Sequence, residues 1–415
     1  MPSPHTARSR RAFLRASAGA VALGALAGCS SSCPDSDPPT PATVVRLDGD
    51  PSGEALPVGG PDWPTLRGDA TNRGLRPAND PPGEGATLRW RTDVAASPAW
   101  PSAPAIADNG SVVYVVGGDG TLHALAAADG SERWRAPAVR NADAVTASNG
   151  TVYVASDDGV VAVRTDSGEA RWERPDLTAT GTPVAHDGDV YVPTDGALYA
   201  FDAVSGDRRW RVPTDGPVTR PAVGLGAVFV AGGALQAVDP ADGSVRWTDQ
   251  VGGVEDFPVV ADGTVYVGSY DGLLAYDRDG TRRWRFERGG GRAFEAPVVA
   301  GRTLYTVEQP GEGPASLFAL ERDDAGGEPT PRWSPYWCSY TGDATAWAAV
   351  GDAAFATIDS GTGPAGGEGL QSFRERDGWA GVQFRTDRSL RAPALTDEAA
   401  VLVTSDGAVC GVGGR

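Results

Sequence analysis

The sequence predicts an all-β chain folded as an eight-bladed β-propeller of four-stranded antiparallel blades, and three repeating columns support this. Tryptophan recurs every 37 or 38 residues, at Trp134, Trp172, Trp210, Trp247 and Trp284. A glycine lies four residues before each of these tryptophans. Asp-Gly pairs between short Val-Tyr-Val segments supply the positive-φ residues that tight hairpins need. A period near 40 residues with four strands per unit is the sequence signature of a propeller blade.

The number of blades follows from the aromatic residue at the end of each second strand. That column reads Tyr114, Tyr153, Tyr191, Phe229, Tyr266, Tyr305 and Phe355, with Val401 in an eighth unit. The eighth unit, 391–412, stops after its third strand, whereas 88–92 resembles a fourth strand without its first three. We therefore expect the N-terminal strand to join the last blade and close the ring, which removes the exposed edges of an open sheet.

The charge of the chain restricts its partners and its surroundings. The formal net charge is −18, and all 36 positive side chains are arginine. Such a surface repels nucleic acid and anionic lipid headgroups, so neither is expected as a partner. An acidic chain without lysine suits a salt-adapted (halophilic) source, because salt screens its self-repulsion. GC-rich coding bias is the alternative explanation for the missing lysine, although it does not explain the excess of acid.

Residues 1–28 read as a twin-arginine signal peptide. Arg10 and Arg11 precede an apolar run at 16–27, which is too short to span a hydrocarbon core of ~30 Å. The run ends in a lipobox-like sequence, and Cys29 supplies the thiol for lipidation. We expect export by the twin-arginine route and lipid anchoring on the outer face of the cytoplasmic membrane, with an uncleaved anchor as the alternative.

Two further parts follow the signal peptide. Residues 29–62 are rich in Ser, Pro and Asp without hydrophobic periodicity, so we expect a disordered tether. Residues 63–415 form the propeller.

The opening Trp63-Pro-Thr-Leu-Arg-Gly-Asp69 with Gly74, and the repeated Asp/Ser-Gly-x-x-x-Trp ending, resemble the pyrroloquinoline-quinone-like (PQQ-like) β-propeller repeat family. The resemblance covers about residues 60–415 and implies one of two branches. Quinoprotein dehydrogenases bind the quinone and a calcium ion in the channel, and they typically carry adjacent cysteines. The BamB-like branch is non-catalytic and binds other proteins.

The cysteines here favour the BamB-like branch, because Cys29, Cys33, Cys338 and Cys410 include no adjacent pair. This branch implies a lipid-anchored extracellular scaffold in the cell envelope, without catalysis or cofactor, whose partner is an envelope or secreted protein. One alternative is a PQQ-dependent dehydrogenase with calcium. Another is an extracellular receptor for a small ligand or carbohydrate.

Candidate binding residues lie two positions before a proline that opens each first strand, and they should ring one end of the channel. The candidates at this channel mouth are Asp143, Asp256, Glu295 and Arg391, with Phe257 and Phe294 beside the two central acids. The competing interpretation is that these are solvated loop residues of an acidic protein.

A candidate partner surface consists of aromatics outside the repeat columns, Trp100, Trp337 and Trp347. Packing of the irregular sixth and seventh blades is the competing explanation. Three scattered histidines make a Cys/His metal site improbable. Cys338 and Cys410 could form a disulfide in an oxidising exterior, and the sequence leaves that pairing open.

Overall fold

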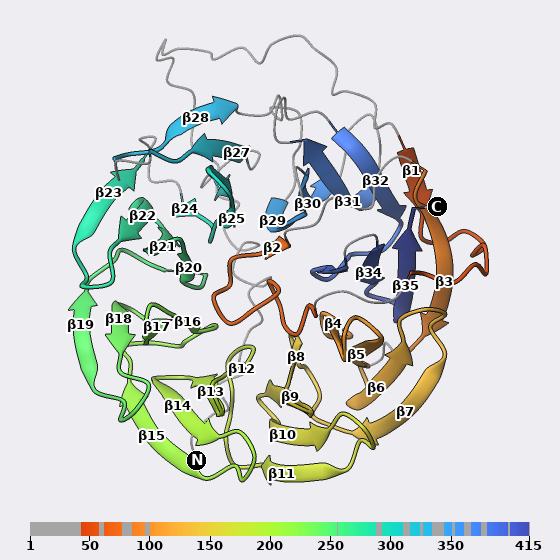
Figure 1. Cartoon of the computed structure of the whole chain (residues 1–415), viewed down its shortest axis with the longest axis horizontal. Helices are drawn as coiled ribbons and strands as arrows, with labels where there is room; N and C mark the ends of the chain where they lie inside the picture. The colour runs from red at the N-terminus through yellow and green to blue at the C-terminus, as the bar shows by residue number, and fades with distance from the viewer. Residues whose placement is uncertain are drawn as a thin grey trace, which may run out of the picture. The chain divides into compact units, whose positions relative to one another are not determined.

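The computed structural model describes the residues 43–57, 62–76, 85–95, 100–254, 256–287, 293–309, 316–323, 327–333, 344–350, 353–360, 367–374, 380–396 and 399–414. Their strands form eight sheets that follow one another around a ring (Figure 1). The predicted eight-bladed propeller is therefore confirmed. In this part of the chain, no helix is long and apolar enough to cross a membrane.

The first four blades are regular four-stranded antiparallel sheets. Their strands are β4 (Ala105–Ala107), β5 (Val112–Val116), β6 (Thr121–Ala126) and β7 (Glu132–Pro137) in blade 1; β8 (Val145–Ser148), β9 (Thr151–Ser156), β10 (Gly159–Arg164) and β11 (Ala170–Arg174) in blade 2; β12 (Val184–His186), β13 (Asp189–Thr194), β14 (Ala197–Asp202) and β15 (Arg208–Pro213) in blade 3; and β16 (Ala222–Gly224), β17 (Ala227–Ala231), β18 (Leu235–Val238) and β19 (Val245–Asp249) in blade 4. The second and third strands are almost wholly buried, because each blade packs between two neighbours.

The remaining blades become less regular along the chain. Their strands are β20 (Val259–Ala261), β21 (Thr264–Ser269), β22 (Gly272–Tyr276) and β23 (Arg282–Phe286) in blade 5; β24 (Ala293–Phe294), β25 (Val298–Ala300), β26 (Thr303–Gln309), β27 (Ser316–Glu321) and β28 (Thr330–Trp333) in blade 6; β29 (Ala344–Val350), β30 (Ala353–Ser360), β31 (Gly367–Arg374) and β32 (Ala380–Thr386) in blade 7; and β33 (Ala394–Leu395), β34 (Ala399–Val403) and β35 (Ala408–Gly413) in blade 8.

The tryptophan and glycine columns join neighbouring blades. The indole N–H of Trp134 donates to the carbonyl of Thr165 in the next blade at 2.8 Å, and the same bond recurs from Trp90, Trp172, Trp210 and Trp247. At Gly168, where φ is +73°, a Cβ would lie 2.8 Å from the Trp134 ring. Glycine is therefore needed both for the left-handed turn and for the close approach of the indole.

The ring closes as the sequence predicts. Strand β3 (Thr87–Asp93) pairs antiparallel with β35, so the fourth strand of the last blade comes from the N-terminal part of the chain. Because its partner lies more than 300 residues away in the sequence, closure joins the two ends of the propeller and leaves blade 8 complete.

The expected disordered tether is wrong for residues 43–57, which we call the strap. Its strand β1 (Thr43–Arg46) pairs parallel with β32 on the outer edge of blade 7. The strap then bonds to the backbone of β3, and the amide of Leu56 donates to Ala128 in blade 1 at 2.8 Å. Three buried apolar side chains hold the strap to the rim: Val45, Leu47 and Leu56. The other predicted tether residues lie largely outside the described part of the chain.

Candidate functional site

The centre of the ring is crossed by residues 62–76, which we call the plug (Figure 1). Its carbonyl groups accept hydrogen bonds of 2.7–3.0 Å from the innermost strands of six blades. The donors, one per blade, are the amides of Ile106, Ala147, Val223, Val260, Val299 and Ala349. The plug ends in β2 (Leu75–Arg76), which pairs parallel with β29. It therefore occupies the inner edges that the blades turn towards the channel.

The plug also fills the channel with side chains. Leu66 packs against Ala103, Ala144 and Ala392 from three different blades, each immediately before the proline position of its first strand. Trp63 is 2% exposed, and it exchanges two backbone hydrogen bonds with Ile106. The small residues on the channel wall leave the volume that Leu66 takes.

Arg67 is a buried cation at the centre of this arrangement. Its Nη2 donates to the carbonyl of Ala296 at 2.9 Å, and its guanidinium carbon lies 5.2 Å from the centroid of the Phe257 ring. Burial lowers the pKa of Arg67, and the charges of Asp256 and Glu295 oppose that shift. The two acids predicted as the sharpest pair thus share one buried cation, which comes from the protein itself.

Arg220 is the second buried cation, and the sequence analysis did not identify it. Its guanidinium donates to the side chains of Asn72 and Thr65 in the plug. Burial lowers its pKa to about 9, Asp69 raises it, and Arg67 lowers it further, so Arg220 remains charged at neutral pH. The available signal was that Arg220 is the one charged residue at its column position, just before the first-strand proline.

Asn72 links these elements. It is fully buried, and its amide nitrogen donates to the carbonyls of both Pro221 and Pro258 at 3.0 Å, while its oxygen accepts from Arg220. One side chain of the plug therefore bonds to two adjacent blades. The charged and polar residues of Trp63–Gly74, which carried the family resemblance, are explained by this anchoring.

The predicted mouth residues form contacts between blades. Asp256 accepts a hydrogen bond from the amide of Ala296 at 3.0 Å through Oδ2 and one from Thr219 through its backbone carbonyl. Glu295 accepts from the side chain of Gln309. Phe257 and Phe294 belong to the hydrophobic core of blades 5 and 6. The structure therefore gives these residues structural contacts, and their binding of a ligand stays a prediction.

Two other predicted residues meet at the junction of blades 8 and 1. The guanidinium carbon of Arg391 lies 5.3 Å from the centroid of the Trp100 ring, and its Nε donates to the carbonyl of Pro101. Asp143 is exposed at the mouth and accepts from the amide of Ala103 through its carbonyl. Trp100 thus belongs to the mouth, although the sequence analysis assigned it to a separate surface.

Several predicted residues remain beyond what the structure describes. Arg10, Arg11, Cys29 and Trp337 lie outside the described residues, and Trp347 is described only as part of the backbone of β29. Cys410 is a free, buried thiol, and its Sγ lies 3.9 Å from the carbonyl of Leu47. Among the described residues, no group of three or more His, Cys, Asp or Glu side chains is arranged to hold a metal ion.

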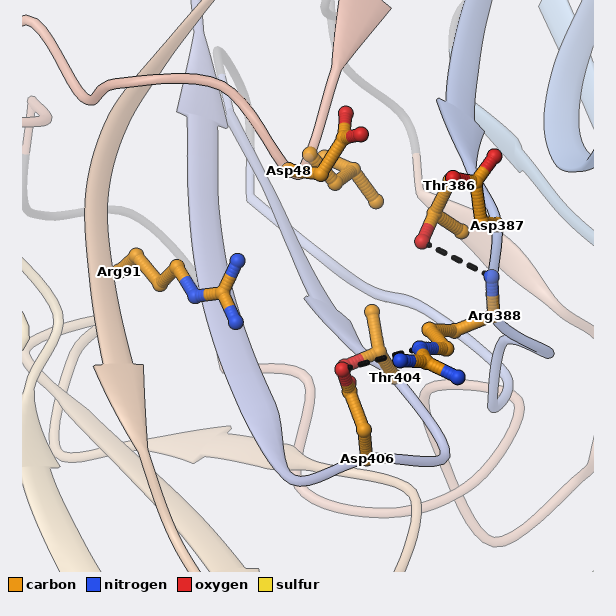
Figure 2. Close-up of a pocket in the computed structure, with 8 residues that line it drawn as sticks. Asp48, Arg91, Thr386, Asp387, Arg388, Thr404 and Asp406 are labelled. Atoms are coloured by element: carbon orange, nitrogen blue, oxygen red, sulfur yellow. Dashed lines mark hydrogen bonds and ion pairs between the residues drawn. The ribbon is translucent and has the colours of Figure 1, made fainter.

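A cavity of about 150 Å³ lies away from the channel, at the rim between blades 7 and 8 (Figure 2). The strap, the connection from β32 to β33, β3 and the turn after β34 line it. The lining residues are Leu47, Asp48, Arg91, Thr386, Asp387, Arg388, Thr404 and Asp406. Three carboxylates and two guanidinium groups therefore share one small, solvent-reached site.

The sequence profile of the family described as "Outer membrane protein assembly factor BamB" matches residues 80–221 and 194–325. No curated protein matches the sequence. Among solved structures, BamB from Moraxella catarrhalis has a TM-score of 0.62 at 16% identity, covering 79% of this chain and 99% of that one.

Two oxidoreductases are as similar in fold. The quinohemoprotein alcohol dehydrogenase from Comamonas testosteroni has a TM-score of 0.65 at 14% identity, covering 85% of this chain and 80% of that one. The enzyme ADHIIG from Pseudomonas putida HK5 has a TM-score of 0.64 at 12% identity, covering 90% of this chain and 82% of that one. At these identities the likeness to each structure concerns the fold alone.

Proposed function

The chain belongs to the family described as outer membrane protein assembly factor BamB, and from that membership we propose that it is a non-catalytic propeller that binds another protein. The partner is an envelope or secreted protein. We further propose that the molecule is exported by the twin-arginine route, lipidated at Cys29 and held on the outer face of the cytoplasmic membrane. It then acts as an anchored scaffold.

The observation that carries the non-catalytic part of the proposal is the plug. A quinone in the centre of the channel would have to displace Leu66 and Arg67, which contact the channel wall. The acids that could face such a cofactor, Asp256 and Glu295, lie beside the charge of Arg67. These residues do not fit a resident quinone at the centre, so we derive no reaction through one.

We propose the channel mouth as the partner surface. Asp143 is exposed there, and Trp100 and Arg391 stack at the junction of blades 8 and 1. An aromatic ring flanked by charges is the composition typical of interface hot spots. The carboxylates of this face favour a partner segment that carries arginine or lysine, because complementary charge steers encounter.

Affinity capture from intact envelopes in high salt tests this proposal. The wild-type chain should retain one partner at a stoichiometric level, and Asp143→Asn with Trp100→Ala should lose it. Asp187→Asn is the matched control, since Asp187 is also an exposed aspartate but lies in the turn at the opposite end of a first strand. Equal capture by the mouth variant and the control would contradict the mouth as the partner surface.

The dehydrogenase alternative has its own experiment. We expect the purified chain, incubated with the quinone and calcium and then desalted, to retain no chromophore and to reduce no dye with alcohols. A chromophore bound at one equivalent together with dye reduction would overturn the non-catalytic proposal. For the anchor, Cys29→Ala should release the protein into the medium, and unchanged membrane retention would contradict lipidation.

A further inference from the structure

The rim cavity brings together three segments that are far apart in the sequence. Asp48 comes from the strap, Arg388 from the connection between blades 7 and 8, and Arg91 from the ring-closing strand β3. Figure 2 shows the guanidinium of Arg91 on one side of the cavity and the side chains of Asp387 and Arg388 on the other. Charges of both signs therefore face the same small volume.

Contacts within the wall hold these side chains in place. Arg388 Nε lies 3.2 Å from Asp406 Oδ2, and Thr404 donates to Asp406 Oδ1 at 2.5 Å. Arg91 Nε pairs with Asp93 at 3.2 Å. Both arginines use Nε for these pairs, which leaves their Nη donors for a ligand.

Both partly exposed acids whose pKa is shifted are ionised at neutral pH. Burial raises the pKa of Asp406, but the hydrogen bond from Thr404 and the charges of Arg388 and Arg91 outweigh it and lower the pKa. A hydrogen bond from Arg46 lowers the pKa of Asp48. The cavity thus offers fixed negative and positive charge together.

The charge pattern discriminates between classes of ligand. A lone cation would meet two guanidinium groups, and the described residues hold no cluster suited to a metal ion. A lone anion would meet three carboxylates. A molecule with both charges can place its carboxylate on the arginines and its ammonium on the aspartates, so both sets of wall charges are paired.

We propose that this rim cavity binds a small zwitterion of the α-amino acid class. The volume suits that size, because a cavity of about 150 Å³ holds a ligand of roughly six non-hydrogen atoms such as benzene. A bound zwitterion would bridge the strap, the blade 7–8 connection and β3, and would therefore stabilise the closed ring. This site is independent of the proposed partner surface at the channel mouth.

Calorimetric titration of the full chain with glycine tests the proposal, with acetate and methylammonium as ligands of one charge only. Ionic strength is held constant, because salt screens partly exposed charges. We expect saturable one-to-one binding of glycine with a dissociation constant on the order of 1 mM, and at least tenfold weaker binding of either single-charge ligand. Glycine should also raise the thermal midpoint.

Two variants assign the binding to the cavity. Arg91→Gln and Asp406→Asn should each weaken glycine binding at least tenfold. Arg285→Gln is the matched control, because Arg285 follows Trp284 as Arg91 follows Trp90, and it forms an exposed pair with Glu287 on another blade. Folding is checked by the thermal midpoint without ligand, and Arg91→Gln, which alters the more peripheral contact, keeps the test valid if Asp406→Asn unfolds.

Three results would overturn the proposal. The first is no saturable binding of glycine, and the second is equal binding of acetate or methylammonium, which would assign the cavity to a single charge. The third is equal weakening by Arg285→Gln, which would show that glycine acts through the general surface.

Discussion

The channel and the rim cavity both gather charged side chains around the N-terminal segment, but they differ in access to solvent. In the channel, Arg67 and Arg220 are 2% and 1% exposed and bond to the protein itself. At the rim, the side chains of Arg388 and Asp406 are 59% and 38% exposed. Buried charge must be bonded internally because desolvation is costly, so the channel charges fix the fold. The rim charges remain available to a ligand.

The largest effect should follow from breaking the anchoring of the plug. Asn72→Ala removes the hydrogen bonds to Pro221, Pro258 and Arg220, and it leaves their buried groups without these partners. We expect the free energy of unfolding to fall by about 3–5 kcal/mol, measured by urea denaturation.

Asn109→Ala controls for the backbone in that experiment. Asn109 has φ of 57°, close to the 60° of Asn72, but it is exposed in a turn. The control should lose only about 1 kcal/mol, from the left-handed backbone. Equal losses in the two variants would mean that the side-chain bonds of the plug contribute little.

A smaller effect should follow from loosening the strap. Leu47 is 1% exposed and packs into the core shared by blades 7 and 8, so Leu47→Ala should cost about 2–4 kcal/mol. The same variant should weaken glycine binding at the rim, because Asp48 is the next residue. A stability close to that of Val44→Ala, where the side chain is 44% exposed, would show that the strap is only loosely held.

The smallest effect concerns the pH dependence of the rim. Since the pKa of Asp406 is lower in the folded chain than in the unfolded chain, its contribution is complete above the unfolded value of about 3.9. That contribution is lost as the pH falls through the folded value. Because the group is more than a third exposed, the contribution should be below about 1 kcal/mol.

Urea denaturation between pH 5 and pH 2 checks this sign. The stability difference between wild type and Asp406→Asn should shrink as the pH falls. A difference that stays constant across this range would contradict an ionised, stabilising Asp406.

The repeating parts of the fold could be predicted from the sequence because every blade repeats the same physical solution. The glycine before each tryptophan and the indole N–H that finds a carbonyl are constraints of blade stacking, and they leave the same residues at the same spacing. Ring closure followed as well, since an eighth unit without a fourth strand and the unassigned strand at 88–92 complete each other.

The non-repeating parts could not be predicted in the same way. The plug is held largely by its carbonyl groups, which any residue carries, so its docking leaves little trace in side chains. The strap has only a few separated apolar residues, and β1 takes its hydrogen bonds from β32, more than 300 residues later. Asp256 and Glu295 were correctly placed together, but Arg67 as their shared cation required knowledge of where the plug runs.

The central claim, that the chain plugs its own channel, is tested most directly by hydrogen exchange resolved to single amides in the full chain. The six inner-edge amides that donate to the plug should be protected as strongly as amides in the middle of a blade. Ala185 is the internal control, because it occupies the same position in blade 3 and donates to no plug carbonyl among the described residues. We predict fast exchange at Ala185 and slow exchange at Val223 and Val260; equally fast exchange at all three would contradict the plugged channel.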